Sequence, residues 1–324
     1  MRFIKLLSLL TAPLVGWALF SSAAYAITVS PVIVDHEVAR GMRVSGRMMI
    51  TNDSKAPQTY YLSVQSFVPV GEDGEQQYLD EADLKGLPSW FRFNQESYQL
   101  APGETAEIPY SILAPQDAEP GGHYATVFFS TNPEAANDRT AINLAAKTGI
   151  VYLVKVAGDV KENASIESFT ANQAIYSHLP ALMSLRIRNT GSVHFRPIGT
   201  LTVRNMWGGI VARVPANPKK AAVLPSSIRR LDTWWTKSTD LAEGGFIAGL
   251  TNEWRNFALG RYTATVDVKY GSLNTALEAR TVSFWVIPWR MGLILLALLL
   301  ILFLLMRLYN KMIISSALKQ SRRR

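Results

Sequence analysis

The chain has 324 residues, no cysteine and a formal net charge of +8. The positive excess lies toward the two ends, because residues 27–287 contain 24 Lys and Arg against 25 Asp and Glu, so a nucleic-acid-binding surface is not implied. Without cysteine the chain forms no disulfide, which in an exported protein favours a bacterial envelope over an animal secretory pathway.

The N-terminus, residues 1–26, has the three parts of an export signal. Arg2 and Lys5 form a positive start, an apolar stretch follows, and Ala24 and Ala26 are the small residues of a signal-peptidase site. We expect cleavage after Ala26, which leaves the mature chain outside the cytoplasm. The apolar stretch is about as long as signal peptides allow, so an uncleaved N-terminal anchor is the alternative.

Alternation of apolar and polar residues with a period of two dominates residues 27–287. The clearest segments are residues 43–51, 183–188 and 262–270. Such alternation is typical of half-buried strands in antiparallel sheets, and turn residues separate the segments. No segment before the C-terminal apolar run is typical of a long amphipathic helix, so we predict an all-β ectodomain.

The two halves of this region carry the same elements in the same order. Each half has an alternating strand that ends in Asn, then a Pro turn that leads into a strand, and finally a Gly-x-Tyr triplet that opens another strand. These residues are Asn52, Pro102 and Tyr124 in the first half, and Asn189, Pro225 and Tyr262 in the second. We therefore predict two tandem immunoglobulin-like β-sandwiches, residues 27–158 and residues 159–287.

The Gly-x-Tyr triplets make a further prediction about the cores. In an immunoglobulin-like sandwich a corner tyrosine lies two residues before the second core cysteine. Here that position holds Thr126 after Tyr124 and Ala264 after Tyr262. We expect Thr126 and Ala264 to face the cores of two sandwiches that lack the disulfide.

A long apolar run follows the predicted sandwiches. Positions 291–306 are sixteen consecutive uncharged residues, which cover roughly 24 Å of helix and are extended by aromatic neighbours toward the thickness of a bilayer. We predict a transmembrane helix at residues 288–309. The tail, residues 310–324, is basic, which by the positive-inside rule places the C-terminus in the cytoplasm. The predicted location is the bacterial cytoplasmic membrane, with a single span and an extracytoplasmic ectodomain.

Several sequence phrases accompany this order of signal, two cysteine-free sandwiches, span and basic tail. They are residues 114–124 at the end of the first half, residues 185–203 and 223–235 in the second half, and residues 284–289 before the span. In order and phrases the chain resembles the membrane-anchored WxL-interacting proteins of bacterial cell surfaces. The resemblance implies that the first domain contacts peptidoglycan and that the second contacts another surface protein.

The sequence gives no support for catalysis. The four histidines, His36, His123, His178 and His194, have no metal-ligand spacing, and residues 27–287 contain no Gly-x-Ser-x-Gly or Ser-x-x-Lys motif for a nucleophile. We predict that the protein is not an enzyme and has no catalytic residue, cofactor or metal. The acidic loop, residues 71–83, has enough oxygen ligands for calcium, but a solvated insertion is the favoured interpretation.

Tryptophans are the best candidates for contact with a ligand or partner. Trp234 and Trp235 are adjacent on a predicted strand, so their side chains point to opposite faces and one of them is expected at the surface. Trp254 lies in an insertion, residues 236–258, and joins them as a candidate. Packing in the core is the alternative for each, because large aromatic side chains are usually mostly buried.

Three functions remain after these observations. The leading hypothesis is a non-catalytic, membrane-anchored surface module that binds a cell-wall polymer, a surface protein, or both. A chaperone-like assembly factor, which pairs its strands with a client, is the first alternative, although pilus chaperones are soluble. An accessory subunit of an envelope membrane complex is the second, although the span shows no small-x-x-x-small seam for helix packing.

Overall fold

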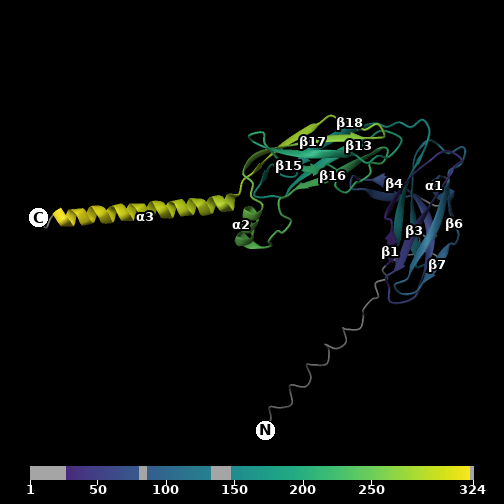
Figure 1. The fold of residues 1–324 in the computed structure, drawn as a ribbon, viewed down its shortest axis with the longest axis horizontal. Coiled ribbons are helices and arrows are strands. Elements are labelled where there is room, and N and C mark those ends of the chain that lie inside the picture. Colours follow the sequence, from purple (N-terminus) through teal and green to yellow (C-terminus); the bar gives the residue numbers. More distant parts are fainter. Residues whose placement is uncertain (1–26, 80–85, 133–146, 322–324) are drawn as a thin grey trace, which may run out of the picture. The chain divides into compact units, whose positions relative to one another are not determined.

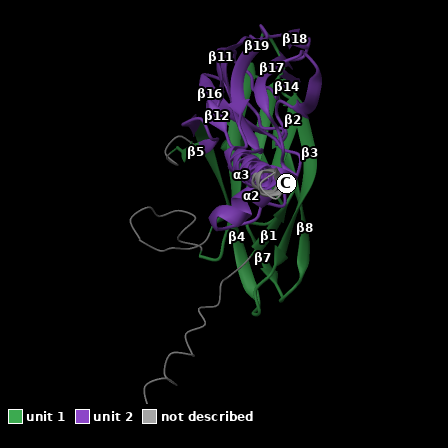
Figure 2. Ribbon diagram, turned by 90° about the vertical axis from the view of Figure 1, so that its left-hand side faces the viewer, with its two compact units in different colours: residues 1–68, 76–159 green, residues 69–75, 160–324 purple. Residues whose placement is uncertain are grey.

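The computed structural model describes residues 27–79, 86–132 and 147–321 (Figure 1). The predicted export signal, with Ala24 and Ala26, and the last three residues of the basic tail lie outside the described residues. The chain divides into two compact units (Figure 2). Unit 1 consists of Met1–Val68 and Gln76–Asp159, and unit 2 consists of Pro69–Glu75 and Val160–Arg324.

Within the described residues, unit 1 is a sandwich of two β-sheets. One sheet has the order β1-β3-β8-β6, made of β1 (Ile27–Ser30), β3 (Arg43–Asn52), β8 (Thr105–Leu113) and β6 (Phe91–Phe93). The other has the order β2-β10-β9-β4-β5, made of β2 (Ile33–Val38), β10 (Thr148–Val156), β9 (Gly121–Ser130), β4 (Gln58–Val70) and β5 (Glu75–Tyr78), with β7 (Ser97–Leu100) paired to β4. A short helix, α1 (Leu87–Trp90), precedes β6.

Unit 2 repeats this plan. One sheet has the order β11-β13-β16, made of β11 (Ala164–Ala171), β13 (Ala181–Asn189) and β16 (Ser227–Trp235). The other has the order β12-β19-β17-β14-β15, made of β12 (Ile175–Tyr176), β19 (Arg280–Val286), β17 (Gly260–Tyr270), β14 (Ile198–Asn205) and β15 (Ile210–Pro215), with β18 (Thr275–Ala276) paired to β17.

The first strand of each unit is divided between the two sheets. In unit 1, β1 pairs antiparallel with β3, and β2, which follows it, pairs parallel with β10 in the other sheet. In unit 2, β11 pairs antiparallel with β13, and β12 pairs parallel with β19. This exchange ties the sheets together at one edge of each sandwich. The predicted fold class, two tandem immunoglobulin-like β-sandwiches and a C-terminal apolar helix, is confirmed.

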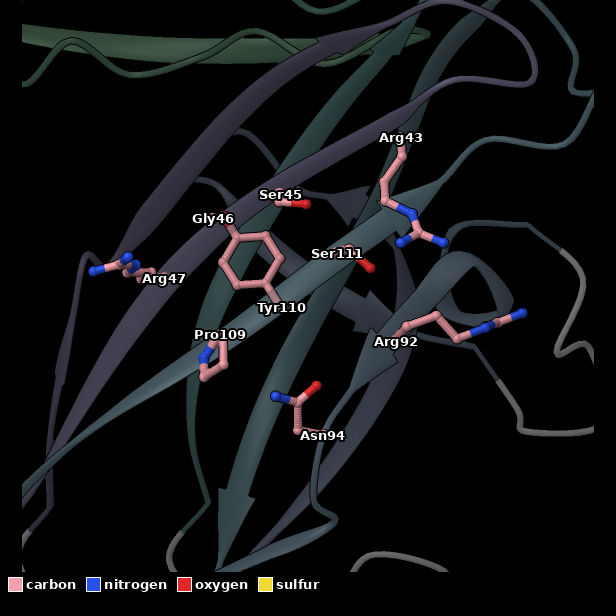
Figure 3. Close-up of a pocket in the computed structure, with 9 residues that line it drawn as sticks. All are labelled: Arg43, Ser45, Gly46, Arg47, Arg92, Asn94, Pro109, Tyr110 and Ser111. Carbon is pink, nitrogen blue, oxygen red and sulfur yellow. The ribbon is translucent and has the colours of Figure 1, made fainter.

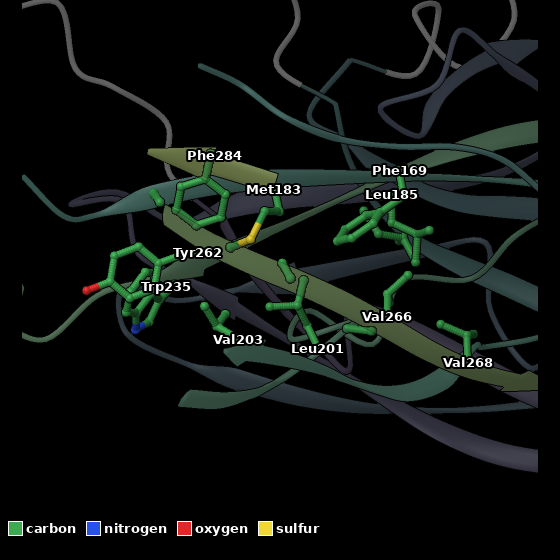
Figure 4. Packing of buried hydrophobic residues seen from close by; sticks show 14 of the residues in the cluster. Phe169, Met183, Leu185, Leu201, Val203, Trp235, Tyr262, Val266, Val268 and Phe284 are labelled. Carbon is green, nitrogen blue, oxygen red and sulfur yellow. The ribbon is translucent and has the colours of Figure 1, made fainter. Parts of the chain in front are cut away.

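The core of each unit lies between its sheets because alternation sends every second side chain inward. In unit 1, Met48 and Ile50 of β3 and Ile108 of β8 are completely buried, and Tyr152 of β10 joins them from the other sheet. In unit 2, Trp235, Tyr262 and Phe284 pack together beside Met183 (Figure 4). Complete burial of such a side chain contributes about 1.5–3 kcal/mol.

The repeated Asn of the two halves has a structural role in both units. The side chain of Asn52 is completely buried, and its Nδ2 donates hydrogen bonds to the carbonyl oxygens of Ala56 (2.9 Å) and Leu100 (3.0 Å). Asn189 is also completely buried, and its Nδ2 donates to the carbonyl oxygens of Val193 (2.9 Å) and Val223 (3.0 Å). Each amide therefore joins the end of its own strand to two other segments of the chain.

Of the two predictions made from the Gly-x-Tyr triplets, the one for Ala264 is confirmed and the one for Thr126 is not. Ala264 faces the core as predicted, and the hydroxyl of Tyr262 bonds the backbone of Leu259 in a tyrosine corner. Thr126 is buried but faces away from the core, because its neighbour Ala125 belongs to the core cluster and adjacent strand residues point to opposite sides. The prediction for Thr126 was therefore wrong, and Ala125, one residue earlier, is the residue that faces the core.

The sequence prediction placed no helix in residues 236–258, but α2 (Gly245–Arg255) forms there. The C-terminal helix, α3 (Trp289–Ser321), continues beyond residue 309, the predicted end of the span. The most apolar 18-residue stretch within its segment Trp289–Ile314 has a mean hydropathy of 2.8, and none of that stretch is buried. By length and composition, it is the one helix among the described residues that can cross a membrane.

Candidate functional site

The three candidate tryptophans lie in different environments. Trp235 is 2% exposed and fills the core of unit 2, where its ring centroid lies 4.9 Å from that of Tyr262. Trp234, its neighbour on β16, is 53% exposed, which confirms that the pair points to opposite faces. Trp254 on α2 is 73% exposed. The surface candidates are therefore Trp234 and Trp254, which lie on different elements.

A groove that the sequence interpretation missed lies on unit 1 (Figure 3). It has a volume of about 500 Å³ and crosses the outer face of the β1-β3-β8-β6 sheet. The lining residues, all on or beside β3, β6 and β8, are Arg43, Ser45, Gly46, Arg47, Arg92, Asn94, Pro109, Tyr110 and Ser111.

The alternation of these strands explains why arginines gather on this face. Met48 and Ile50 of β3 point into the core, so Arg43 and Arg47 point outward. Arg92 of β6 lies opposite Ser111 of β8 in the register and points to the same side. Small side chains separate the arginines, because Ser45 and Ser111 are also direct partners in the β3–β8 register. Long cationic side chains around short hydroxyls produce the groove.

Two of the three arginines, Arg47 and Arg92, have partners within unit 1. Arg47 pairs with Glu107 at 2.7 Å, and both side chains are well exposed. Nη1 of Arg92 donates to the carbonyl oxygens of Ser89 and Phe91, each at 2.7 Å, which orients the guanidinium without cancelling its charge. Arg43 makes no ion pair with another described residue. The face therefore offers positive charge to an anion, and arginine suits carboxylate or phosphate groups.

The floor of the groove is held by a tyrosine of the core. Tyr110 lies opposite Gly46 in the register, and a Cβ on Gly46 would lie 2.3 Å from the Tyr110 hydroxyl. That hydroxyl lies 2.9 Å from Nε2 of His36. Burial lowers the pKa of His36 below its ordinary value and raises the pKa of Tyr110. At neutral pH both groups are uncharged, so the arginines supply the charge of this face.

The predicted acidic loop, residues 71–83, is described only to residue 79. Glu72 accepts a hydrogen bond from Nε of Arg186 at 2.6 Å, and Asp73 pairs with Arg230 at 2.8 Å, all within unit 2. The hydrogen bond from Arg186 lowers the pKa of Glu72 below its ordinary value. These carboxylates hold arginines of β13 and β16, so the described part of the loop acts in ion pairs. The described residues contain no group of His, Cys, Asp and Glu that could hold a metal ion.

No family model matches the chain, and no curated protein matches it. Among solved structures, the chain is similar to the class 5 fimbriae chaperone CfaA, with 12% identity over 81% of this chain and 100% of that one and a TM-score of 0.36. It is similar to the E. coli chaperone DraB, with 11% identity over 80% of this chain and 97% of that one and a TM-score of 0.35.

A third similar structure is a protein of unknown function from Porphyromonas gingivalis, with 13% identity over 80% of this chain and 99% of that one and a TM-score of 0.29. These values describe a distant similarity to PapD-like immunoglobulin domains and assign no family. The immunoglobulin-like fold implied by the resemblance to WxL-interacting proteins is confirmed by the strand order, and membership of that family stays a prediction.

Proposed function

We propose that this protein is a non-catalytic, membrane-anchored surface module of a bacterial envelope whose first domain binds an anionic cell-wall polymer. The observation that carries the proposal is the arginine-lined groove of unit 1, formed by Arg43, Arg47 and Arg92 around two serines. Peptide stems of peptidoglycan end in carboxylates, and guanidinium groups bind carboxylates in paired hydrogen bonds. The resemblance to WxL-interacting proteins supports the same assignment for the first domain.

The anchor in this proposal is α3. Its segment Trp289–Ile314 is long and apolar enough to cross a membrane, and Arg307 and Lys311 follow toward its C-terminal end. By the positive-inside rule the C-terminus lies in the cytoplasm and both sandwiches lie outside. The module then joins the wall polymer to the cytoplasmic membrane.

Sedimentation with washed peptidoglycan sacculi tests the polymer assignment. Full-length protein in detergent micelles is spun with sacculi and with a mock matrix, and the retained fraction is measured at increasing salt. We expect specific retention that weakens with salt, because exposed charges are screened, and a loss of retention in the double variant Arg43→Gln, Arg92→Gln.

A matched control distinguishes the groove from general basic charge. The double variant Arg204→Gln, Arg213→Gln removes two exposed arginines from β14 and β15 of unit 2 and is expected to bind sacculi like the wild type. Equal retention of both double variants would exclude the groove as the site. A co-purifying protein client in place of wall retention would instead support the chaperone-like alternative, and a partner lost when the span is exchanged would support the accessory subunit.

A further inference from the structure

Helix α2 buries small and polar residues and exposes large apolar ones. Gly249, Asn252 and Glu253 are its buried residues, whereas Ile247 is 78% exposed and Trp254 is 73% exposed. In a domain surrounded by water, an amphipathic helix turns its apolar side toward the core. The reversed arrangement in α2 indicates that its apolar side faces a medium other than water.

The apolar residues of α2 form one continuous stripe, in which Phe246, Ile247 and Trp254 are exposed and Leu250 is half-buried. Phe246, Leu250 and Trp254 follow one another at intervals of four residues, and Ile247 lies three residues before Leu250, so they share one face of the helix. Phe246 is 48% exposed. The stripe therefore runs from the first turn of α2 to its last.

The buried face of α2 is tied to the first turn of α3, which lies beside it (Figure 1). Glu253 is completely buried, and its carboxylate accepts hydrogen bonds from the backbone N–H of Arg290 (3.3 Å) and of Met291 (2.9 Å). Nη1 of Arg290 donates to the same carboxylate at 3.1 Å. Glu253 thus satisfies backbone donors at the start of α3 that have no partner within the helix.

Two further contacts fix the position of α2 along α3. The Arg290 side chain crosses α2 at Gly249, where an added Cβ would lie 2.5 Å from the guanidinium carbon. The same guanidinium lies 4.6 Å from the centroid of the Trp289 ring, and the ring of Phe246 meets Trp289 edge-on at 6.2 Å. Hydrogen bonds, charge and ring contacts therefore hold α2 against the first residues of α3.

The start of α3 is also the start of its apolar segment, since the part that can cross a membrane begins at Trp289. Helix α2 is therefore held at the level where such a span enters the bilayer. Tryptophan favours the membrane–water interface, and a helix with one apolar face lies in the plane of the interface with that face buried. We propose that α2 lies in the interface of the outer leaflet, with Ile247 and Trp254 inserted among the lipids.

This assignment gives unit 2 a second membrane contact besides the span, and it rests on the proposed insertion of α3. A single helix leaves a domain free to swivel at the membrane surface, whereas a second contact beside it fixes the face that the domain turns toward the lipid. The occupant of the apolar stripe is a lipid surface, because Phe246 at the start of the stripe contacts Trp289, the first residue of the apolar segment of α3.

Site-directed spin labelling tests the proposal, since the chain has no cysteine and a single introduced cysteine reports one position. Full-length Ile247→Cys and Trp254→Cys variants are labelled and reconstituted in vesicles of phosphatidylcholine and phosphatidylglycerol. Collision of the label with oxygen, which concentrates in lipid, is compared with collision with a water-soluble nickel chelate. Both positions are exposed, so the labels leave the packing of unit 2 unchanged.

Two reference positions bracket the result. Leu273 is 86% exposed in the turn between β17 and β18 and reports water, and Leu299 lies in the middle of the apolar segment of α3 and reports the span. We expect the oxygen-to-nickel ratios at positions 247 and 254 to shift away from that at 273 and toward that at 299. Ratios equal to that at 273, with a lipid-like ratio at 299, would overturn the interfacial helix and leave the anchor. A water-like ratio at 299 would overturn both.

Discussion

At the scale of single residues, buried polar groups decide how each sandwich is closed. Both the nitrogen and the oxygen of the Asn52 side-chain amide have hydrogen-bond partners. Nδ2 donates to backbone carbonyl groups, and Oδ1 accepts from the Tyr60 hydroxyl (2.9 Å) and the Ser54 hydroxyl (2.7 Å). A buried amide is unfavourable unless its donors and acceptors are satisfied. Asn189 meets the same requirement in unit 2, with Gly191 N–H donating to its Oδ1 at 2.8 Å.

Replacement of Asn52 by Ala is therefore expected to destabilise unit 1. The carbonyl groups of Ala56 and Leu100 and the hydroxyl of Tyr60 lose a partner, and the free energy of unfolding falls by about 1–3 kcal/mol. Chemical denaturation measures the loss. Asn94→Ala, at an exposed position of the same unit, is the control, and equal stability of the two variants would contradict the role of the buried amide.

His36 makes the stability of unit 1 depend on pH. Burial lowers the pKa of His36 below its ordinary value in the folded state, so the unfolded chain binds a proton more readily. The contribution of neutral His36 is complete above the unfolded pKa of about 6.5 and is lost as the pH falls through the lower, folded pKa. We expect the unfolding free energy of His36→Gln to decline less than that of the wild type over this acidic range, as measured by denaturation at a series of pH values.

At the scale of elements, the contact between α2 and α3 depends on one buried carboxylate. Glu253 is completely buried while Arg290 keeps partial access to solvent. Loss of the carboxylate leaves Arg290 without its anionic partner and leaves two backbone donors unsatisfied at the start of α3. The nearby pair of Arg255 and Asp240 is exposed, and exposed pairs contribute little.

Glu253→Gln is expected to loosen α2 locally. The free energy of opening of α2 falls by about 1.5–3 kcal/mol, which is the range for hydrogen bonds to charged groups. Hydrogen exchange of the α2 amides in the full-length protein measures this change. Asp240→Asn, which removes the exposed ion pair between the segment before α2 and Arg255 of the helix, is expected to change the free energy of opening by less than about 1 kcal/mol. Similar exchange in both variants would show that Glu253 does not hold the helix.

The strands were predictable from sequence where one face is apolar and the other polar. In β9 this signal fails, because Ala125, Val127 and Phe129 belong to the core cluster while Phe128 and Thr126 on the other face are also buried. Phe128 packs edge-on against Tyr78 at 4.9 Å. Because both faces of β9 are buried, the alternation of side chains cannot identify the face that meets the core. The sequence prediction therefore assigned Thr126 to the core in place of Ala125.

Helix α2 escaped prediction for a different reason. It begins after Gly244 with Gly245, both at positive φ, and has only eleven residues, so its apolar period is short and its start resembles a turn. Its apolar stripe also faces outward, so the helix lacks the core-facing apolar side by which helices are normally recognised in a sequence. The arginine-lined groove of unit 1 could not be predicted either. Arg43 on β3 and Arg92 on β6 lie on strands that are brought together by their common partner β8, and the sequence does not reveal this pairing.

At the scale of the whole molecule, the chain combines a cationic groove on unit 1 with an apolar helix at its C-terminal end. The order of sandwiches and helix follows from hydrophobic period and run length, so the sequence predicts it well. The identity of a ligand depends on a few exposed side chains. Which side chains are exposed depends in turn on which residues of the same strand pack into the core. The wall polymer therefore stays a proposal, whereas the two sandwiches are shown.

The most direct measurement asks whether one molecule joins a membrane to the wall. Full-length protein is reconstituted in vesicles that contain a fluorescent lipid, the vesicles are mixed with washed sacculi, and lipid fluorescence in the low-speed pellet is recorded. We predict that the lipid sediments with sacculi when the vesicles carry wild-type protein or the Arg204→Gln, Arg213→Gln variant, and that it stays in the supernatant with the Arg43→Gln, Arg92→Gln variant. Lipid that remains in the supernatant with wild-type protein, although the protein is inserted in the vesicles, would contradict the proposed function.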